Sequence, residues 1–147
     1  MKSYQAPEPG MPLQEVESPT PKPTGREVVL KTIACGVCHT DIHLHSGAFD
    51  LGDGNKLNVP VPNPFTLGHE VFGEVVAIGP DASNVSIGDK RIVYPWVGCN
   101  QCDVCHNGDE HLCSSGPVIG VMMPGGFGDH VIVPDSKYLH DAGDTPE

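Results

Sequence analysis

Cysteine and histidine are the residues of this 147-residue chain best suited to chemistry, and four of the six cysteines fall in one short segment. Four thiolates within fifteen residues can converge on a single tetrahedral ion, which is the geometry that Zn²⁺ prefers. A zinc ion held by four cysteines is a closed structural site, because no position stays open for a substrate. The spacing therefore predicts a structural zinc lobe over residues 98–113, with the ligands Cys99, Cys102, Cys105 and Cys113.

Other interpretations of this lobe stay open. Disulfides would need an oxidising compartment, and a redox switch would need accessible, low-pKa thiolates. An iron–sulfur cluster fits poorly, because the bacterial ferredoxin spacing ends with three residues and Cys-Pro. Here seven residues separate Cys105 from Cys113, and Ser114 follows Cys113. His106 and His111 could replace a thiolate, but we interpret them as solvated loop histidines.

A second group of reactive side chains lies where a β-branched strand ends and a short helix is expected. Its run Cys38-His39-Thr40-Asp41 combines a thiol, an imidazole, a hydroxyl and a carboxylate. Gly68-His69-Glu70 stands at the head of another expected strand. Each feature alone has a plain structural interpretation, because a Cys after a buried strand is usually a small core residue and Thr or Asp commonly begins a helix.

Short strands and frequent turns must position both groups. Thr40 is expected to cap a helix that runs to about His45, residues 48–66 are expected to form a loop, and Gly73 is expected to mark a bulge. Cys35 is interpreted as a buried strand residue, and His45, His130 and His140 as structural or solvated. Short strands without helical periodicity favour a mainly β fold, a barrel or a partly open barrel. The expected strands cover 13–17, 27–35, 71–79, 91–94 and 129–133.

The charge balance and hydropathy of the chain exclude two classes of partner, nucleic acids and membranes. Lys and Arg total 8 while Asp and Glu total 19, giving a formal net charge of −11 and no basic footprint for nucleic acid. No apolar run approaches the roughly 18 residues of a membrane span. The N-terminus has no apolar signal-peptide region, so we expect a cytoplasmic protein that contacts neither membranes nor nucleic acid.

Taken together, these motifs carry a resemblance. Residues 36–41, Gly68-His69-Glu70, the four-cysteine lobe and residues 125–130 resemble the N-terminal catalytic domain of the zinc-dependent medium-chain alcohol dehydrogenases. The resemblance covers nearly the whole chain. It implies a GroES-like, partly open β-barrel over residues 1–147 with short helices and a zinc lobe.

The resemblance also implies a catalytic zinc. Cys38 and His69 would be two of its ligands, and Glu70 would be the carboxylate that can approach the metal. Asp41 would hold the second ring nitrogen of His69 and so fix its tautomer. A zinc ion with an open position lowers the pKa of a bound alcohol, so that hydride can leave for a nicotinamide ring.

Further roles follow from the same resemblance. Thr40 would take the proton of the substrate hydroxyl and pass it towards His43, whose unperturbed pKa near 6.5 suits that task. His39 would contact the pyrophosphate of the cofactor. Trp96 would line the pocket for a small alcohol, aldehyde or ketone.

The cofactor would be NAD or NADP, yet no Gly-x-Gly-x-x-Gly fingerprint opens a helix in the sequence. The family places its nucleotide domain after this one and its third catalytic-zinc ligand just beyond Glu147. We therefore expect a truncated domain, inactive alone, whose parent is a homodimer or homotetramer. The alternatives are a zinc-stabilised binding module without chemistry and a thiol redox sensor.

Overall fold

The computed structural model describes residues 1–59 and 61–143, and the fold is mainly β. The strands are short, as the frequent turns indicated, and the helices are few. The strands are β1 (Lys2–Ala6), β2 (Gln14–Glu17), β3 (Val28–Gly36), β4 (Ala48–Gly52), β5 (Asn55–Asn58), β6 (Phe65–Thr66), β7 (Glu70–Ile78), β8 (Lys90–Val93), β9 (His130–Val133) and β10 (Leu139–Asp141). The helices are α1 (His39–Ser46), α2 (Asp103–His106) and the 3-10 turns η1 (Glu110–Leu112) and η2 (Ser136–Tyr138).

Two antiparallel sheets form the body of the molecule. The larger has the order β10-β8-β7-β3-β9, and the smaller has the order β2-β1-β6. They meet where β1 runs beside the segment that leads into β9, because Tyr4 N donates to Phe127 O at 2.8 Å and Asp129 N donates to Lys2 O at 2.9 Å. This junction closes the sheets into a partly open barrel and confirms the expected fold class.

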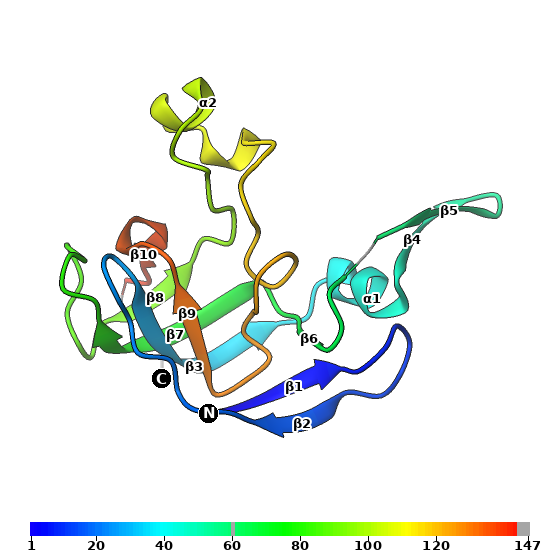
Figure 1. Cartoon of the computed structure of the whole chain (residues 1–147), viewed down its shortest axis with the longest axis horizontal. Helices are drawn as coiled ribbons and strands as arrows, with labels where there is room; N and C mark the ends of the chain where they lie inside the picture. Colours follow the sequence, from blue (N-terminus) through cyan, green and yellow to red (C-terminus); the bar gives the residue numbers. More distant parts are fainter. Residues whose placement is uncertain (60, 144–147) are drawn as a thin grey trace.

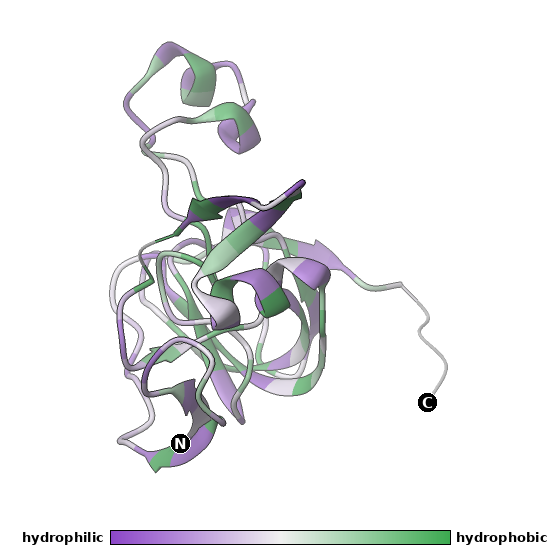
Figure 2. Ribbon diagram, turned by 90° about the vertical axis from the view of Figure 1, so that its right-hand side faces the viewer, coloured by the Kyte–Doolittle hydropathy of each residue, from purple (hydrophilic) through white to green (hydrophobic). Residues whose placement is uncertain are grey.

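Two segments stand away from the barrel (Figure 1). One is the lobe with α2 and η1, joined to the body by two crossings of the chain. The other is the hairpin of β4 and β5, which extends beyond α1. Figure 2 shows the same separation of the lobe from the barrel in a view turned by 90°.

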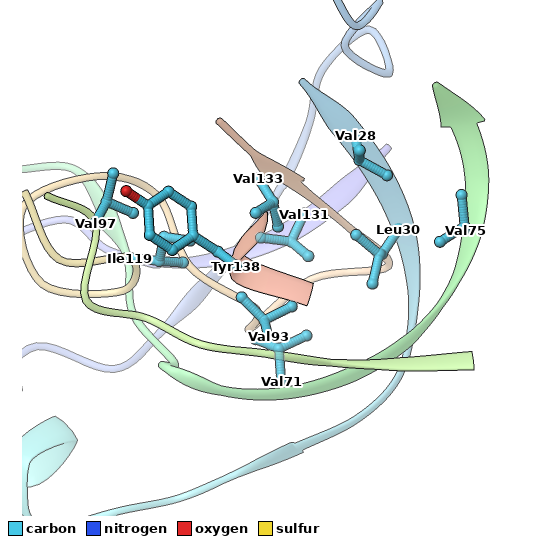
Figure 3. Packing of buried hydrophobic residues seen from close by; sticks show 10 residues of the cluster. All are labelled: Val28, Leu30, Val71, Val75, Val93, Val97, Ile119, Val131, Val133 and Tyr138. Carbon is cyan, nitrogen blue, oxygen red and sulfur yellow. The ribbon is translucent and has the colours of Figure 1, made fainter. Parts of the chain in front are cut away.

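The barrel encloses an aliphatic core. Alternate residues of neighbouring strands point to one face of a sheet, and here these are mostly valines. Leu30 of β3, Val75 of β7 and Val133 of β9 are each fully buried. Figure 3 shows their side chains converging with those of seven neighbours, including Tyr138 of η2. This core holds the ends of β3 and β7, which lead to the second group of reactive residues.

The structure corrects two local expectations. Residues 48–66 are not a plain loop, because β4 and β5 pair around the turn residues Asp53 and Gly54, whose φ angles are +51° and +80°. Helix α1 is capped by Cys38 rather than by Thr40. The Cys38 sulfur accepts from Thr40 N at 3.5 Å, and the Asp41 carboxylate accepts from Cys38 N at 2.9 Å. A sulfur can take the cap position because the reciprocal carboxylate completes the capping box.

The expected irregularity at Gly73 is present, although the extra residue lies on the facing strand. The register of β3 and β7 shifts between Thr32 and Ala34, directly after the pair Thr32–Gly73. Among the described residues, none of the helices has the length and apolar character needed to cross a membrane.

Candidate metal centres

The four cysteines of the lobe converge. The sulfur of Cys105 lies 3.8 Å from that of Cys99 and 3.5 Å from that of Cys102, and the sulfurs of Cys102 and Cys113 are 3.9 Å apart. A tetrahedral zinc with Zn–S bonds of about 2.3 Å requires sulfurs separated by about 3.8 Å. The thiols are free rather than bonded in pairs. Their spacing and chemistry therefore fit one zinc ion.

Backbone geometry prepares this site for thiolates. N–H groups of Cys99 and Ser115 lower the pKa of the Cys113 thiol to about 6. The pKa of Cys99 is also lowered, chiefly by the N–H of Gln101. Burial acts in the opposite direction on Cys105 and raises its pKa to about 12. A cation among the sulfurs would favour the thiolate form of all of them.

Polar contacts from η2 fix the lobe to the barrel. The Lys137 ammonium donates to Glu110 Oε1 and to Asn100 Oδ1, both at 2.7 Å. The Tyr138 hydroxyl accepts from the buried amide of Gly98 at 3.1 Å. Sequence reasoning missed these residues, because nothing in the sequence shows that residues 136–138 return to the base of the lobe. His106 and His111 are both exposed.

The second group also converges. One ligand atom each from Cys38, His69 and Glu70 lies within 4.8 Å of the other two. The register of the sheet explains why, since the end of β3 pairs with the start of β7 through Gly36 and Glu70. Thiolate, imidazole and carboxylate are the donors that Zn²⁺ takes in proteins, so these residues fit such an ion.

Asp41 connects the two segments that carry these donors. Its carboxylate is 2% exposed, accepts from Cys38 N at 2.9 Å and accepts from Gly68 N at 3.1 Å. The ring nitrogen Nδ1 of His69 lies 3.3 Å from Asp41 Oδ1. That contact lacks the angle of a hydrogen bond, so the Asp41 carboxylate is hydrogen-bonded to the backbone rather than to the His69 ring.

The other predicted site residues lie on α1, except for Trp96. Thr40 and His43 are half-buried and lie three residues apart on α1, which places them on neighbouring turns of one face. His39 is exposed and stacks on His43, with the ring centroids 4.5 Å apart. Phe49 of the hairpin covers the His43 ring at 4.7 Å and was not predicted. Trp96 is exposed on the connection between β8 and the lobe.

Cys35 lies close to the same group but has another character. Burial raises its pKa to about 11, so the thiol stays protonated near neutral pH. The thiol donates to the neighbouring Gly36 carbonyl at 3.7 Å. It therefore resembles a small strand side chain more than a thiolate ligand.

A partly open β-barrel here carries a four-cysteine cluster and a separate Cys-His-Glu group, each of which could hold a metal ion. Residues 24–144 match the family described as the alcohol dehydrogenase GroES-like domain. The chain belongs to that family.

Related proteins agree with this assignment. The chain is 39% identical over 141 residues to an NAD-dependent alcohol dehydrogenase of Sulfurisphaera tokodaii, covering 95% of this chain and 40% of that protein. It is 36% identical to an L-threonine 3-dehydrogenase of Symbiobacterium thermophilum, covering 94% and 37%. The chain thus spans about 40% of the length of the curated relatives it matches.

Solved structures give the same result. A thermostable alcohol dehydrogenase of Pyrobaculum aerophilum superposes with a TM-score of 0.82 at 29% identity, covering 99% of this chain and 41% of that one. The D-arabinose dehydrogenase of Sulfolobus solfataricus gives a TM-score of 0.81 at 27% identity, covering 99% and 41%.

Proposed function

We propose that this chain is the metal-binding catalytic part of a zinc-dependent dehydrogenase that interconverts small alcohols with aldehydes or ketones, using NAD or NADP. The observation that carries the proposal is the convergence of Cys38, His69 and Glu70 within 4.8 Å. The names of the relatives support the reaction class, since they include alcohol, threonine and arabinose dehydrogenases. They differ in substrate, so the proposal stops at a small hydroxyl compound.

Cys38 and His69 would hold the catalytic zinc, with Glu70 able to approach it. When bound, the zinc supplies a Lewis acid that polarises the substrate oxygen. NAD or NADP would accept the hydride that alcohol oxidation releases, so the residues of this chain would have to carry away only the proton. Asp41 would keep the two ligand-bearing segments in register through its bonds to Cys38 N and Gly68 N.

The proton route would use α1. The Thr40 hydroxyl can accept the substrate proton and donate its own, and His43 lies one turn further along the same face. His39 is exposed beside His43 and would meet the cofactor phosphates, while Trp96 would shape the substrate pocket.

The proposed function also implies a domain organisation and an assembly for the complete enzyme. The barrel and the 98–113 lobe would form the catalytic domain, and the nicotinamide would be held by a nucleotide-binding domain outside the sequence described above. The parent enzyme would be a homodimer or homotetramer. The isolated 147-residue chain would therefore bind zinc without turning over alcohols.

Metal analysis with cysteine variants tests the proposal. Wild type should retain two zinc ions per chain, of which Cys38→Ser loses one and Cys102→Ser loses the other. In the complete gene product, His69→Ala should remove alcohol-dependent NAD(P)H formation by more than the roughly 10- to 100-fold that loss of an outer-shell partner costs. Full activity in that variant would overturn the proposal. A single zinc confined to the lobe, together with no alcohol-dependent NAD(P)H formation by the complete gene product, would instead favour a non-catalytic binding module.

A further inference from the structure

The proposed chemistry leaves one sequence motif without a role, the glycine-rich segment Gly125-Gly126-Phe127-Gly128. It opens no helix and does not resemble a phosphate-binding turn. It lies instead beside the short segment that ends in His69. Three backbone hydrogen bonds join the two: Gly125 N donates to Thr66 O at 2.8 Å, Gly126 N to Gly68 O at 2.8 Å and Phe127 N to Leu67 O at 3.0 Å.

Gly68, the residue before His69, is enclosed on several sides. Its amide donates to the buried Asp41 carboxylate at 3.1 Å, and its carbonyl accepts from Gly126. Its φ angle of +97° is one that side chains rarely adopt. A Cβ atom there would lie 2.6 Å from the Phe127 ring and 2.9 Å from the Cys35 sulfur.

The backbone that faces Gly68, at Gly120 and Gly125, also leaves no space for a side chain. A Cβ atom on Gly125 would overlap the Gly68 carbonyl oxygen and come within 2.7 Å of the Leu67 carbonyl oxygen. A Cβ atom on Gly120 would also overlap that Gly68 carbonyl. These are backbone atoms, so they cannot turn aside as the end of a side chain can. The close approach of the two segments therefore requires glycine.

The His69 ring depends on this backbone. Its nearest anionic neighbour is Asp41, whose Oδ1 lies 3.3 Å from Nδ1 without the angle of a hydrogen bond. A ring that no hydrogen bond orients takes its position from its own Cα and from packing. We infer that the 125–128 segment is a backbone clamp that positions His69 as a metal ligand, with Gly125 its tightest contact.

The clamp rests on the proposed function, because it presupposes that His69 binds metal. Gly125 is a positioning residue and touches neither metal nor substrate. Gly125→Ala should displace the Gly68 carbonyl and move the His69 ring away from Cys38. Misplacing one ligand should lower the affinity of that centre by about 10- to 100-fold, the cost of losing an outer-shell partner.

The experiment is chelator competition for Co²⁺ in the 147-residue chain, with the visible spectrum of each centre recorded. The four-cysteine lobe serves as an internal reference in the same molecule. Gly54→Ala is the control, since Gly54 lies outside the clamp and its added methyl meets no atom within 4 Å. We expect Gly125→Ala to weaken and spectrally alter only the Cys38–His69 centre, and Gly54→Ala to leave both affinities within about twofold of wild type.

Other outcomes would overturn the inference. Equal affinities in wild type and Gly125→Ala would remove the clamp and leave the proposed function standing. An equal loss in Gly54→Ala would show general destabilisation instead of positioning. Wild-type chain that binds Co²⁺ only in the lobe would refute the clamp, whose premise is a metal bound by His69, and would leave the proposed function to the activity test of His69→Ala. If Gly125→Ala does not fold, Phe127→Leu, which trims the ring over Gly68, should give a smaller loss at the same centre, and no loss would count against the clamp.

Discussion

Asp41 shows how one buried carboxylate can hold two ligand-bearing segments together. Its two oxygens accept hydrogen bonds from Cys38 N and Gly68 N, which belong to different strand ends. Asn in its place would keep one acceptor and turn an N–H₂ donor towards a backbone N–H. A buried donor without an acceptor costs about 1–3 kcal/mol.

We therefore expect Asp41→Asn to lower the free energy of unfolding by about that amount in urea titrations. The exposed turn residue Asp53 provides the control. Its φ of +51° suits Asn, so Asp53→Asn should change the free energy by less than about 0.5 kcal/mol. A loss in Asp41→Asn no larger than in the control would contradict the bridging role.

The sequence placed Asp41 in the site beside the His69 ring, and its Oδ1 lies 3.3 Å from His69 Nδ1. The hydrogen bonds that the carboxylate accepts from two backbone amides were not predicted. The resemblance, more than the residue types at 38–41 and 68–70, indicated that these segments meet. Which amide faces which oxygen depends on the path of the backbone after β3, and residue types do not encode that path.

At the scale of elements, the β4–β5 hairpin is the least supported part of the fold. It forms a two-stranded sheet of its own, and a hairpin without further strands is marginally stable. Its turn was missed although Asp53-Gly54 between short strands is a hairpin signal. The exposed residues around it, including Leu51 and Leu57, gave no alternation that would have indicated strands.

Gly54→Ala should loosen this hairpin alone. Gly54 has a φ of +80° and no neighbouring atom within 4 Å, so the added methyl costs only backbone strain, about 1 kcal/mol. Amide hydrogen exchange should accelerate several-fold across residues 48–58 and stay unchanged in β3 and β7. Asp53→Asn should leave the same amides unaffected. Faster exchange throughout the barrel would refute an independent hairpin.

The contact of η2 with the lobe should depend on pH. The hydrogen bond from Lys137 lowers the pKa of Glu110. Burial opposes a rise in the pKa of Lys137, but its interactions with Glu110 and Tyr138 together outweigh burial and raise that pKa. A lowered carboxyl pKa stabilises the folded state above the ordinary value of 4.5, and this stability is lost as pH falls through the lowered pKa.

Lys137→Met should consequently cost about 1 kcal/mol at pH 7, a modest figure because the ammonium is partly exposed. The difference from wild type should shrink as the pH falls below 4.5, when Glu110 becomes protonated. Denaturant unfolding of both proteins across pH 3–7 measures it, since other titrating groups cancel in the difference. Lys90→Met, on an exposed strand position, should show no such trend. A pH-independent difference would exclude the ion pair as the cause.

For the whole molecule, the barrel and the lobe were predictable, whereas the contacts that attach the lobe to the barrel were not. The β-branched runs at 28–33 and 71–78 contribute Val28, Leu30, Val71 and Val75 to one core, while Ile33 is exposed. Such runs specify strands through burial, a signal that residue types carry directly. The return of Lys137 and Tyr138 to the lobe depends on contacts distant in sequence, for which no local pattern exists.

The division between barrel and lobe predicts how the molecule responds to metal loss. The core cluster lies in the barrel, whereas Cys105 is the only buried side chain of the described lobe residues 99–113. Cys102→Ser should therefore unfold the lobe, whose stability comes from the ion, and leave the barrel folded. In amide NMR spectra, signals of residues 99–113 should collapse while those of Val28, Leu30 and Val75 keep their positions. Wild type stripped by a chelator should give the same pattern in the lobe. Loss of the barrel signals in Cys102→Ser would mean that the zinc supports the whole fold, and the lobe could no longer be treated as a separate unit.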